Sequence, residues 1–352
     1  MHFLKTLGSN ILILGDGNLT FSLSLSRIFP DKYIIATVYE EESEWRKKYA
    51  DFDADVLDKI KNECKNTKVV FKVDALDFEK VSTKTEFTDI IFNFPHYGGK
   101  TNLRKCRLLL RKIFESVARN LMASEPRSSR FHVTLAPGQS GIEATDLIYT
   151  NVPPKHNKDS WQPLELASEF GMVATSVERF DSYKFPEYSS SGYKNTQRGF
   201  INGKNSQTIT FELSGYFIDV ERFSLERVKF IESSFVPSRT IDHPVFHQFR
   251  PVFQYHISII FGSSHNWQDI EKTEGHLFSL MGHCAGPLLV SVCELADRRC
   301  TAPGDLHNRI YCVKYQGIVL PLCRTLGNAL HDEFCSHLNR YFEEGNYDLR
   351  VS

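Results

Sequence analysis

The strongest constraint on the fold is an alternation of patterns along the first 100 residues, where short β-branched runs are separated by longer amphipathic segments. This order is typical of βαβ units, whose strands lie parallel in one sheet with helices on its faces. The runs that we expect to form strands are 11–14, 33–38, 69–73, 89–92, 131–135 and 172–177. We therefore predict that a doubly wound α/β domain opens the chain.

The order of patterns changes after residue 250. The expected elements there are strand 253–261, helix 267–281, strand 287–297, strand 308–316, helix 322–342 and strand 346–351. This βαββαβ order is that of a ferredoxin-like α+β sandwich. The length of 352 residues suits two domains, because a domain usually has about 100–200 residues. We predict domains over 1–205 and 250–352, joined by a connecting segment over 206–249.

The charge balance limits how the chain can bind nucleic acid. With 42 Lys and Arg against 43 Asp and Glu, the formal net charge is -1, which excludes binding of polyanions by bulk charge alone. Residues 100–130 nevertheless carry nine basic residues against two acidic ones. RNA phosphates are one explanation for this local excess, and solvated helix faces are the other.

The cysteine spacing and the lengths of the apolar runs indicate which metal sites, membrane contacts and cellular compartments to expect. The eight cysteines form no C-x-x-C pair, so we expect no metal site of the zinc type. The segment 1–6 has no apolar core of a secretory signal, and no run of about 18 apolar residues occurs. We expect free thiols and no membrane contact, in the cytoplasm or the nucleus, including the nucleolus, while a mitochondrial location stays open.

Polar residues and glycines follow three of the predicted strands. Gly15, Asp16 and Gly17 follow the first strand, Glu40 the second and Asp74 the third. Glycines at such a turn let a ligand approach the backbone, and a carboxylate after the second strand can accept hydrogen bonds from ribose hydroxyls. A third glycine at dinucleotide spacing and a P-loop lysine are both missing. Two plainer explanations stay open: a simple tight turn, and an acidic helix start at Glu40.

The segment after the fourth predicted strand is the most informative one. Asn93 offers an amide donor and acceptor to a base edge, and His96 offers a ring face. The neighbouring candidates for contacts with RNA are Phe94, Pro95, Tyr97 and Lys100. These residues point to a crevice for a flat heterocycle at the carboxyl edge of the sheet. In the structural alternative, Pro95 ends a strand and the aromatic rings belong to the core.

Residues 10–200 resemble the Rossmann-like domain of the 25S rRNA uridine-N3 methyltransferase family. The resemblance rests on four segments: 14–25, 36–37, 73–75 and, most specifically, 92–100. It implies S-adenosylmethionine as the cofactor and methyl transfer to uridine N3 in rRNA or tRNA. Asn93 then orients the base and contacts the cofactor, and His96 accepts the N3 proton. Cofactor contacts also fall to Gly15, Asp16, Gly17, Glu40 and Asp74, and RNA contacts to Phe94, Pro95, Tyr97, Lys100, Arg104 and Arg198.

Residues 250–352 resemble the ferredoxin-fold anticodon-binding domain that ends phenylalanyl-tRNA synthetases. The matching pieces are 250–251, 255–258, 290–297 and 348–350. The two halves together resemble the ferredoxin-fold anticodon-binding domain-containing proteins, which implies an RNA partner, either rRNA or tRNA. A protein-interaction or dimerisation module is the alternative for this half, and the oligomeric state stays open. For the whole chain, a non-catalytic RNA-binding protein is the second hypothesis, supported by Asn18 and Leu19 in the first loop. A nicotinamide-dependent dehydrogenase is disfavoured.

Overall fold

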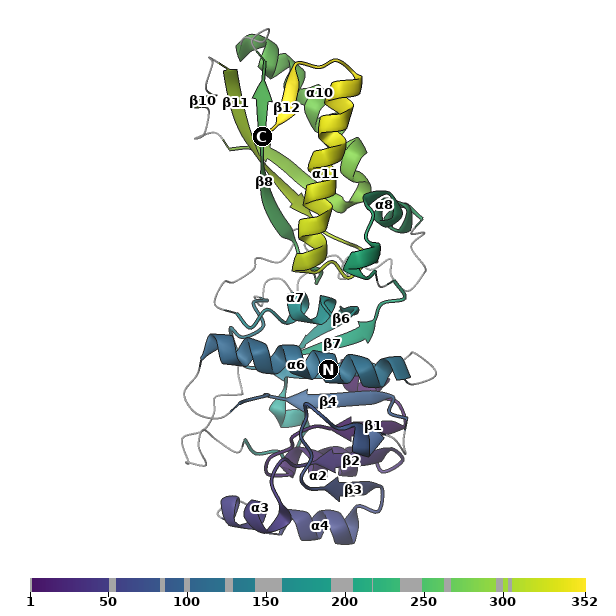
Figure 1. Ribbon diagram of the computed structural model, residues 1–352. Coiled ribbons are helices and arrows are strands. Elements are labelled where there is room, and N and C mark those ends of the chain that lie inside the picture. Colours follow the sequence, from purple (N-terminus) through teal and green to yellow (C-terminus); the bar gives the residue numbers. More distant parts are fainter. Residues whose placement is uncertain are drawn as a thin grey trace. The chain divides into compact units, whose positions relative to one another are not determined.

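The computed structural model divides into two compact units, each described here by itself (Figure 1). The first consists of Met1–Leu213 with Pro244–Phe249, and the second of Ser214–His243 with Arg250–Ser352. The described residues are 2–50, 55–82, 86–97, 102–123, 129–142, 160–190, 205–216, 218–234, 249–262, 267–295, 300–302 and 306–352. No helix among these residues combines the length and the apolarity needed to cross a membrane.

The first unit is built on a seven-stranded sheet with the order β3-β2-β1-β4-β5-β7-β6. Its strands are β1 Asn10–Ile13, β2 Tyr33–Thr37, β3 Thr67–Val70, β4 Asp89–Asn93, β5 Arg130–Leu135, β6 Met172–Arg179 and β7 Gln207–Leu213. The strands β1 to β5 are parallel, whereas β7 is antiparallel to both β5 and β6. The five parallel strands bring their carboxyl ends to one edge.

Helices cover both faces of this sheet. The helices are α1 His2–Thr6, α2 Thr20–Ile28, α3 Glu42–Lys48, α4 Val56–Glu63, α5 Glu79–Ser82, α6 Leu103–Ala123 and α7 Pro163–Ser168, and Ser182–Lys184 forms a 3-10 turn. Side chains alternate along β1, so that Leu12 packs in the core with α6 and α7 while Ile11 packs with α1 and α2. A sheet buried on both faces is what the apolar runs require.

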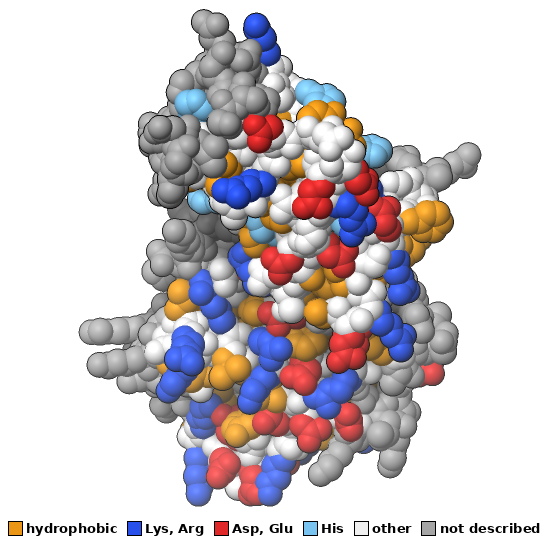
Figure 2. Space-filling view, turned by 45° about the horizontal axis from the view of Figure 1, so that its top comes forward, with side chains coloured by type: hydrophobic (Ala, Val, Ile, Leu, Met, Phe, Trp, Pro, Cys, Tyr) orange, Lys and Arg blue, Asp and Glu red, His pale blue; other side chains and the backbone are white. Residues whose placement is uncertain are grey.

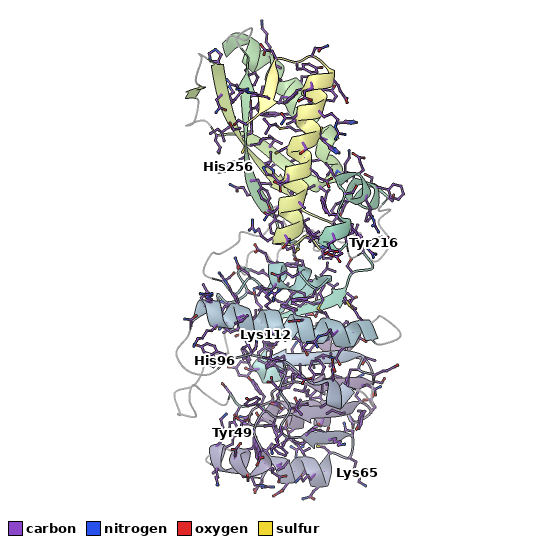
Figure 3. The ribbon with its side chains drawn as sticks, viewed as in Figure 1. Tyr49, Lys65, His96, Lys112, Tyr216 and His256 are labelled. Atoms are coloured by element: carbon purple, nitrogen blue, oxygen red, sulfur yellow. The ribbon has the colours of Figure 1, made fainter. Side chains whose placement is uncertain are left out.

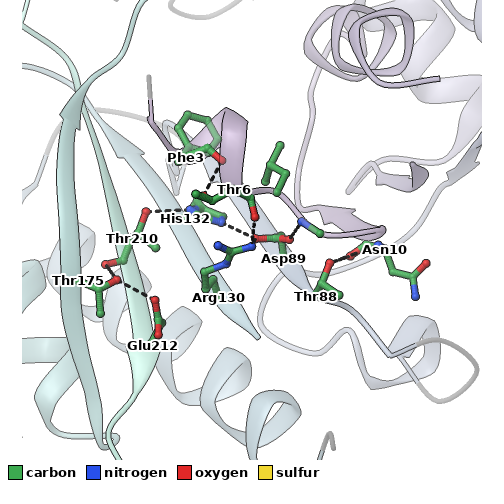
Figure 4. A network of polar contacts seen from close by, with 12 residues as sticks. Phe3, Thr6, Asn10, Thr88, Asp89, Arg130, His132, Thr175, Thr210 and Glu212 are labelled. Atoms are coloured by element: carbon green, nitrogen blue, oxygen red, sulfur yellow. Dashed lines mark hydrogen bonds and ion pairs between the residues drawn. The ribbon is translucent and has the colours of Figure 1, made fainter. Parts of the chain in front are cut away.

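The amino edge of the sheet is closed by buried polar groups (Figure 4). Asp89, at the start of β4, accepts hydrogen bonds from the Gly8 backbone (2.7 Å) and from His132 Nε2 on β5 (2.9 Å). The Arg130 guanidinium lies 3.0 Å from the same carboxylate. His132 Nδ1 lies 2.9 Å from the Thr210 hydroxyl on β7. This network ties the segment that follows α1 to three strands of the sheet.

The second unit is a ferredoxin-like sandwich. Its elements are α8 Leu225–Ser233, β8 Phe253–Phe261, α10 Trp267–Ala285, β9 Leu289–Glu294, β10 Cys300–Ala302, β11 Leu306–Tyr315, α11 Arg324–Glu344 and β12 Leu349–Val351, with 3-10 turns at Val220–Arg222 and Gly286–Leu288. The antiparallel sheet has the order β12-β8-β11, with β9 and β10 both paired to β11. Residues of α8, α10 and α11 pack on one face of it.

The predicted fold class is confirmed in both halves: a Rossmann-like α/β domain followed by a βαββαβ sandwich. The elements that were not predicted include β7, α8 and β10. Two helices, α3 and α4, lie between β2 and β3. The expected strand 287–297 is shorter, because Gly286 (φ +60°) and Pro287 begin a 3-10 turn there. The limits proposed for the two domains remain our prediction; the structure places β7 in the first unit and α8 in the second.

Candidate cofactor and RNA site

The predicted cofactor residues follow four adjacent strands of the first sheet. Asp74 comes after β3, Glu40 after β2, Gly15–Gly17 after β1, and Asn93 ends β4. Because these strands are parallel neighbours, all four positions lie at one edge. The structure therefore brings the cofactor candidates together.

The turn after β1 is fixed by backbone geometry. Gly15 has a φ of +59°, a left-handed conformation that favours glycine. Its N–H donates to the Thr37 hydroxyl (3.2 Å), and the Asp16 N–H donates to the Thr37 carbonyl (2.9 Å). A Cβ at Gly15 would lie 3.1 Å from the Phe92 ring. Both the conformation and the packing against β4 thus require glycine here.

The Asp16 carboxylate points to helix α2. It accepts hydrogen bonds from the Ser22 N–H (2.7 Å) and from the Ser22 hydroxyl. Burial raises the pKa of Asp16 to about 6, although both bonds from Ser22 act in the opposite direction. Next in the turn, the Gly17 carbonyl accepts a hydrogen bond from the indole N–H of Trp45 (2.5 Å). These contacts hold the turn on α2 and α3, and they engage the Asp16 side chain within the protein.

Glu40 and Asp74 present carboxylates at neighbouring strand ends. Glu40 is half-buried and forms an ion pair with Lys48. Asp74 is exposed, and its carboxylate accepts the Leu76 N–H at 2.9 Å. The Lys72 N–H donates to the Glu40 carbonyl (3.1 Å), which joins the loops that follow β2 and β3. Both carboxylates retain lone pairs for further donors.

Asn93 is oriented by a chain of hydroxyl groups. The Thr134 hydroxyl on β5 donates to Asn93 Oδ1 at 2.6 Å, and it lies 3.0 Å from the Thr208 hydroxyl on β7. Since the Thr134 proton goes to Asn93, Thr208 is the donor in the second bond. One lone pair of Asn93 Oδ1 is thereby engaged. The Asn93 NH₂ group has no hydrogen-bond partner among the described residues, so this end of the amide can donate to a ligand.

The residues after Asn93 have different environments. Phe94 has a φ of +52° and is half-buried, with its ring edge-on to Phe180 at 5.4 Å between centroids. Pro95 is buried, whereas His96 is exposed beyond the end of β4 (Figure 3). The His96 and Tyr97 rings stack at 5.6 Å with an interplanar angle of 14°. Partial enclosure of the imidazole lowers the pKa of His96, which favours its neutral, proton-accepting form.

The basic residues of α6 are largely engaged within the protein. Lys105 lies over the Tyr97 ring (5.4 Å), Arg107 donates to the Ser160 carbonyl, and Arg111 pairs with Glu169 (2.6 Å). Arg104 is exposed. The other two basic candidates, Lys100 and Arg198, lie outside the described residues. Figure 2 shows acidic and basic side chains interspersed on the face that it draws.

Ser189, in the segment after β6, forms hydrogen bonds with the loop that follows β1. The Asn18 amide donates to the Ser189 carbonyl at 2.9 Å. The Thr20 hydroxyl donates to the same carbonyl and accepts from the Ser189 N–H, both at 3.1 Å. Arg27 of α2 pairs with Glu187 at 2.7 Å. This explains Asn18 in the loop: its side chain joins the turn to the segment after β6.

Comparison with known protein families identifies the family of this chain. Residues 12–192 match the model of the family described as "BMT5-like: rRNA (uridine-N3-)-methyltransferase BTM5-like". The chain belongs to the BMT5-like family. The glycine turn, Glu40, Asp74 and the Asn93–Tyr97 segment all lie within the matched region.

Two curated relatives support the wider group that the sequence analysis indicated. The BMT5-like chain is 29% identical to the mouse "Ferredoxin-fold anticodon-binding domain-containing protein 1 homolog" over 194 residues, which is 54% of this chain and 29% of that protein. It is 29% identical to the human protein of that name over 196 residues, with the same shares. The match thus spans less than a third of the length of either relative.

Solved methyltransferase structures were also found. The 16S rRNA methyltransferase KamB covers 60% of this chain and 91% of its own, with a TM-score of 0.37 and 12% identity. The 30S ribosomal A1408 methyltransferase from an uncultured bacterium covers 60% and 91%, with a TM-score of 0.38 and 9% identity.

Two contributors to the BMT5-like site were missed from the sequence. Thr37 holds the glycine turn, and Thr134 orients Asn93. Both are threonines near the ends of strands, a position that gives no local signal of a role. Thr134 is the register partner of Asn93 in the β4–β5 pair. Only this pairing between distant segments reveals its contact.

Proposed function

We propose that the first unit transfers a methyl group from S-adenosylmethionine to N3 of a uridine in rRNA or tRNA. The observation that carries the proposal is the Asn93 amide, held by Thr134 through its oxygen, with the exposed His96 three residues further on. Membership of the BMT5-like family supports it.

The polar groups at the carboxyl edge of the sheet fit an adenosine-type cofactor. Glu40 follows β2, where a carboxylate can accept hydrogen bonds from ribose hydroxyls. Asp74 is exposed after the neighbouring β3 and can accept a bond from an amino group on a base. The Gly15–Gly17 turn and Asn93 lie on the next two strands. The turn contributes its backbone, because the Asp16 side chain is bonded to Ser22. When bound, S-adenosylmethionine supplies a methyl group on a positively charged sulfur.

The chain itself supplies orientation and a proton acceptor. The free NH₂ of Asn93 donates to a carbonyl oxygen of the uracil ring and fixes the position of N3. Uridine N3 carries a proton that must leave during methylation, and the neutral imidazole of His96 accepts it. The lowered pKa of His96 favours the neutral ring, which can accept a proton.

The target uridine must be unpaired or extruded to reach this edge. Phe94, Pro95 and Tyr97 form the wall on which we place the base, and Lys100, Arg104 and Arg198 are the proposed phosphate contacts. The ferredoxin-like unit holds a structured part of the RNA by analogy with synthetase domains.

The test uses the purified full chain, radiolabelled S-adenosylmethionine and total cellular RNA, with nucleoside analysis for N3-methyluridine. We expect Asn93→Ala and His96→Ala to lower methyl incorporation by at least about 100-fold, with unchanged far-UV circular dichroism. The rate of His96→Ala should recover partly at alkaline pH, where N3 loses its proton without a base. His283→Ala, an exposed histidine on α10, is the matched control. Undiminished incorporation in both site variants would refute the proposal.

A non-catalytic RNA-binding protein is the second candidate. The observation that favours it is that Asp16 and Glu40 already have internal partners, Ser22 and Lys48. Calorimetric titration with S-adenosylmethionine separates the two candidates. Heat of binding that disappears in Glu40→Ala supports the enzyme, and no heat in the wild type supports the scaffold.

A further inference from the structure

Two cysteines lie side by side in the sheet of the second unit. Cys312 on β11 and Cys293 on β9 are register partners in an antiparallel pair. Directly opposed residues in such a pair have Cα atoms about 4.5–5.5 Å apart and side chains on the same face. A disulfide needs a Cα separation of about 4.4–6.8 Å. The backbone therefore already has the spacing of a cross-strand disulfide.

Both side chains lie on the face away from the helices. The adjacent register pair, Val313 with Val292, packs in the core with α10 and α11. Since successive residues of a strand point to opposite faces, the cysteine pair points away from that core. Cys293 is exposed, Cys312 is 3% exposed, and both are free thiols. His256 of β8 is the other register partner of Cys312 and is exposed (Figure 3).

We propose that Cys293 and Cys312 form a reversible redox pair that a peroxide oxidises to a disulfide. Nothing in the proposed methyl transfer uses these residues, so this proposal stands independently of it. The oxidant is hydrogen peroxide, and a small dithiol reverses the reaction.

The chemistry proceeds in two balanced steps. The Cys293 sulfur attacks one peroxide oxygen, the O–O bond breaks, and the products are a sulfenic acid and one water. The Cys312 sulfur then attacks the Cys293 sulfur, the S–O bond breaks, and the hydroxyl leaves as a second water with the Cys312 proton. Two thiols are oxidised by two electrons, and one peroxide is reduced to two waters.

The environments of the two thiols assign the order of these steps. Peroxide reaches the exposed Cys293 directly. Burial raises the pKa of Cys312, and the Cys293 thiol within hydrogen-bond reach raises it further. Cys312 therefore stays protonated until the sulfenic acid forms beside it. Among the described side chains, no group of three His, Cys, Asp or Glu is placed to hold a metal ion.

The test is peptide mapping of the full chain after peroxide treatment and alkylation. Trypsin separates the two thiols, because Cys312 lies in peptide 310–314 and Cys293 in peptide 273–298. We expect these peptides to become linked, with the mass of two hydrogens lost, and to separate again with dithiothreitol. The free thiol count should fall from eight to six per chain.

Variants identify the residues responsible. Cys284 shares the tryptic peptide of Cys293, so Cys284→Ser must retain the link and Cys293→Ser must lose it. Cys335→Ser is the matched control, because this half-exposed thiol lies beside His331 (3.8 Å) and should not affect the link. The proposal is overturned if peptide 310–314 stays fully alkylated, or if Cys293 links to peptide 300–309, which contains Cys300. Cys293→Ser is the main test variant, because it leaves the buried Cys312 unchanged.

Discussion

Two carboxylates on adjacent strands of the first sheet have opposite environments. Asp89, at the amino end of β4, is bonded to His132, Arg130 and the Gly8 backbone. Asp16, after the carboxyl end of β1, has Ser22 as its side-chain partner among the described residues. Burial alone would raise the pKa of Asp89, but its partners hold that pKa below the usual range. The pKa of Asp16 is raised to about 6.

From this difference we expect the amino edge of the sheet to serve stability and the carboxyl edge to serve function. At the amino edge, buried polar groups satisfy one another, and such networks stabilise a unique arrangement. At the carboxyl edge, the Asp74 and His96 side chains are exposed, and the Asn93 amide is bonded to Thr134 through its oxygen. Removing a group should therefore lower stability at the first edge and activity at the second.

The largest expected effect is at the amino edge. Asp89→Ala leaves Arg130, His132 and the Gly8 N–H without their common acceptor. We therefore expect the free energy of local unfolding around β4 and β5 to fall by about 3 kcal/mol. Hydrogen exchange of the β4 and β5 amides measures it. The matched control is Asp74→Ala, the same change at an exposed site on the carboxyl edge, which should cost about 1 kcal/mol or less. Equal losses in the two variants would remove the distinction between the edges.

A smaller effect is expected at the carboxyl edge, where Thr134 orients Asn93. Thr134→Val removes the donor that holds Asn93, and we expect methyl transfer to fall about tenfold, with a stability loss of about 1 kcal/mol. Thr208→Val removes only the outer bond of the same chain, so it should cost similar stability and retain activity. A rate loss as large in Thr208→Val would show that Asn93 is not oriented through Thr134.

The pH dependence of stability should distinguish the two carboxylates. The lowered pKa of Asp89 contributes stability above pH 3.8, which is lost as the pH falls below that value. The raised pKa of Asp16 works in the other direction: its contribution is complete below pH 3.8 and is lost as the pH rises to about 6. Relative to Asp16→Asn, the wild type should lose about 1 kcal/mol for each pH unit between pH 4 and 6. A constant difference between pH 4 and 7 would contradict the assignment.

The sequence predicted where the candidate residues lie in the sheet better than it predicted their contacts. Parallel strands end at one edge, so Glu40, Asp74 and Asn93 could be placed together from the order of patterns alone. The inward turn of Asp16 could not be predicted, because an acid after a glycine is equally compatible with a ligand and with the start of a helix. The strand β7 was also missed, although residues 208–211 alternate between polar and apolar types.

Both fold classes could be predicted from the sequence, because local periodicity and the order of elements are properties of the chain, and the motifs of the first half carried the resemblance to the family. The tertiary structure alone decided that β7 inserts between β5 and β6, that Thr134 holds Asn93, and that Cys293 faces Cys312. The physical reason is that strand register depends on hydrogen bonds between segments far apart in the sequence, and a shift of one residue would turn each of these side chains to the other face.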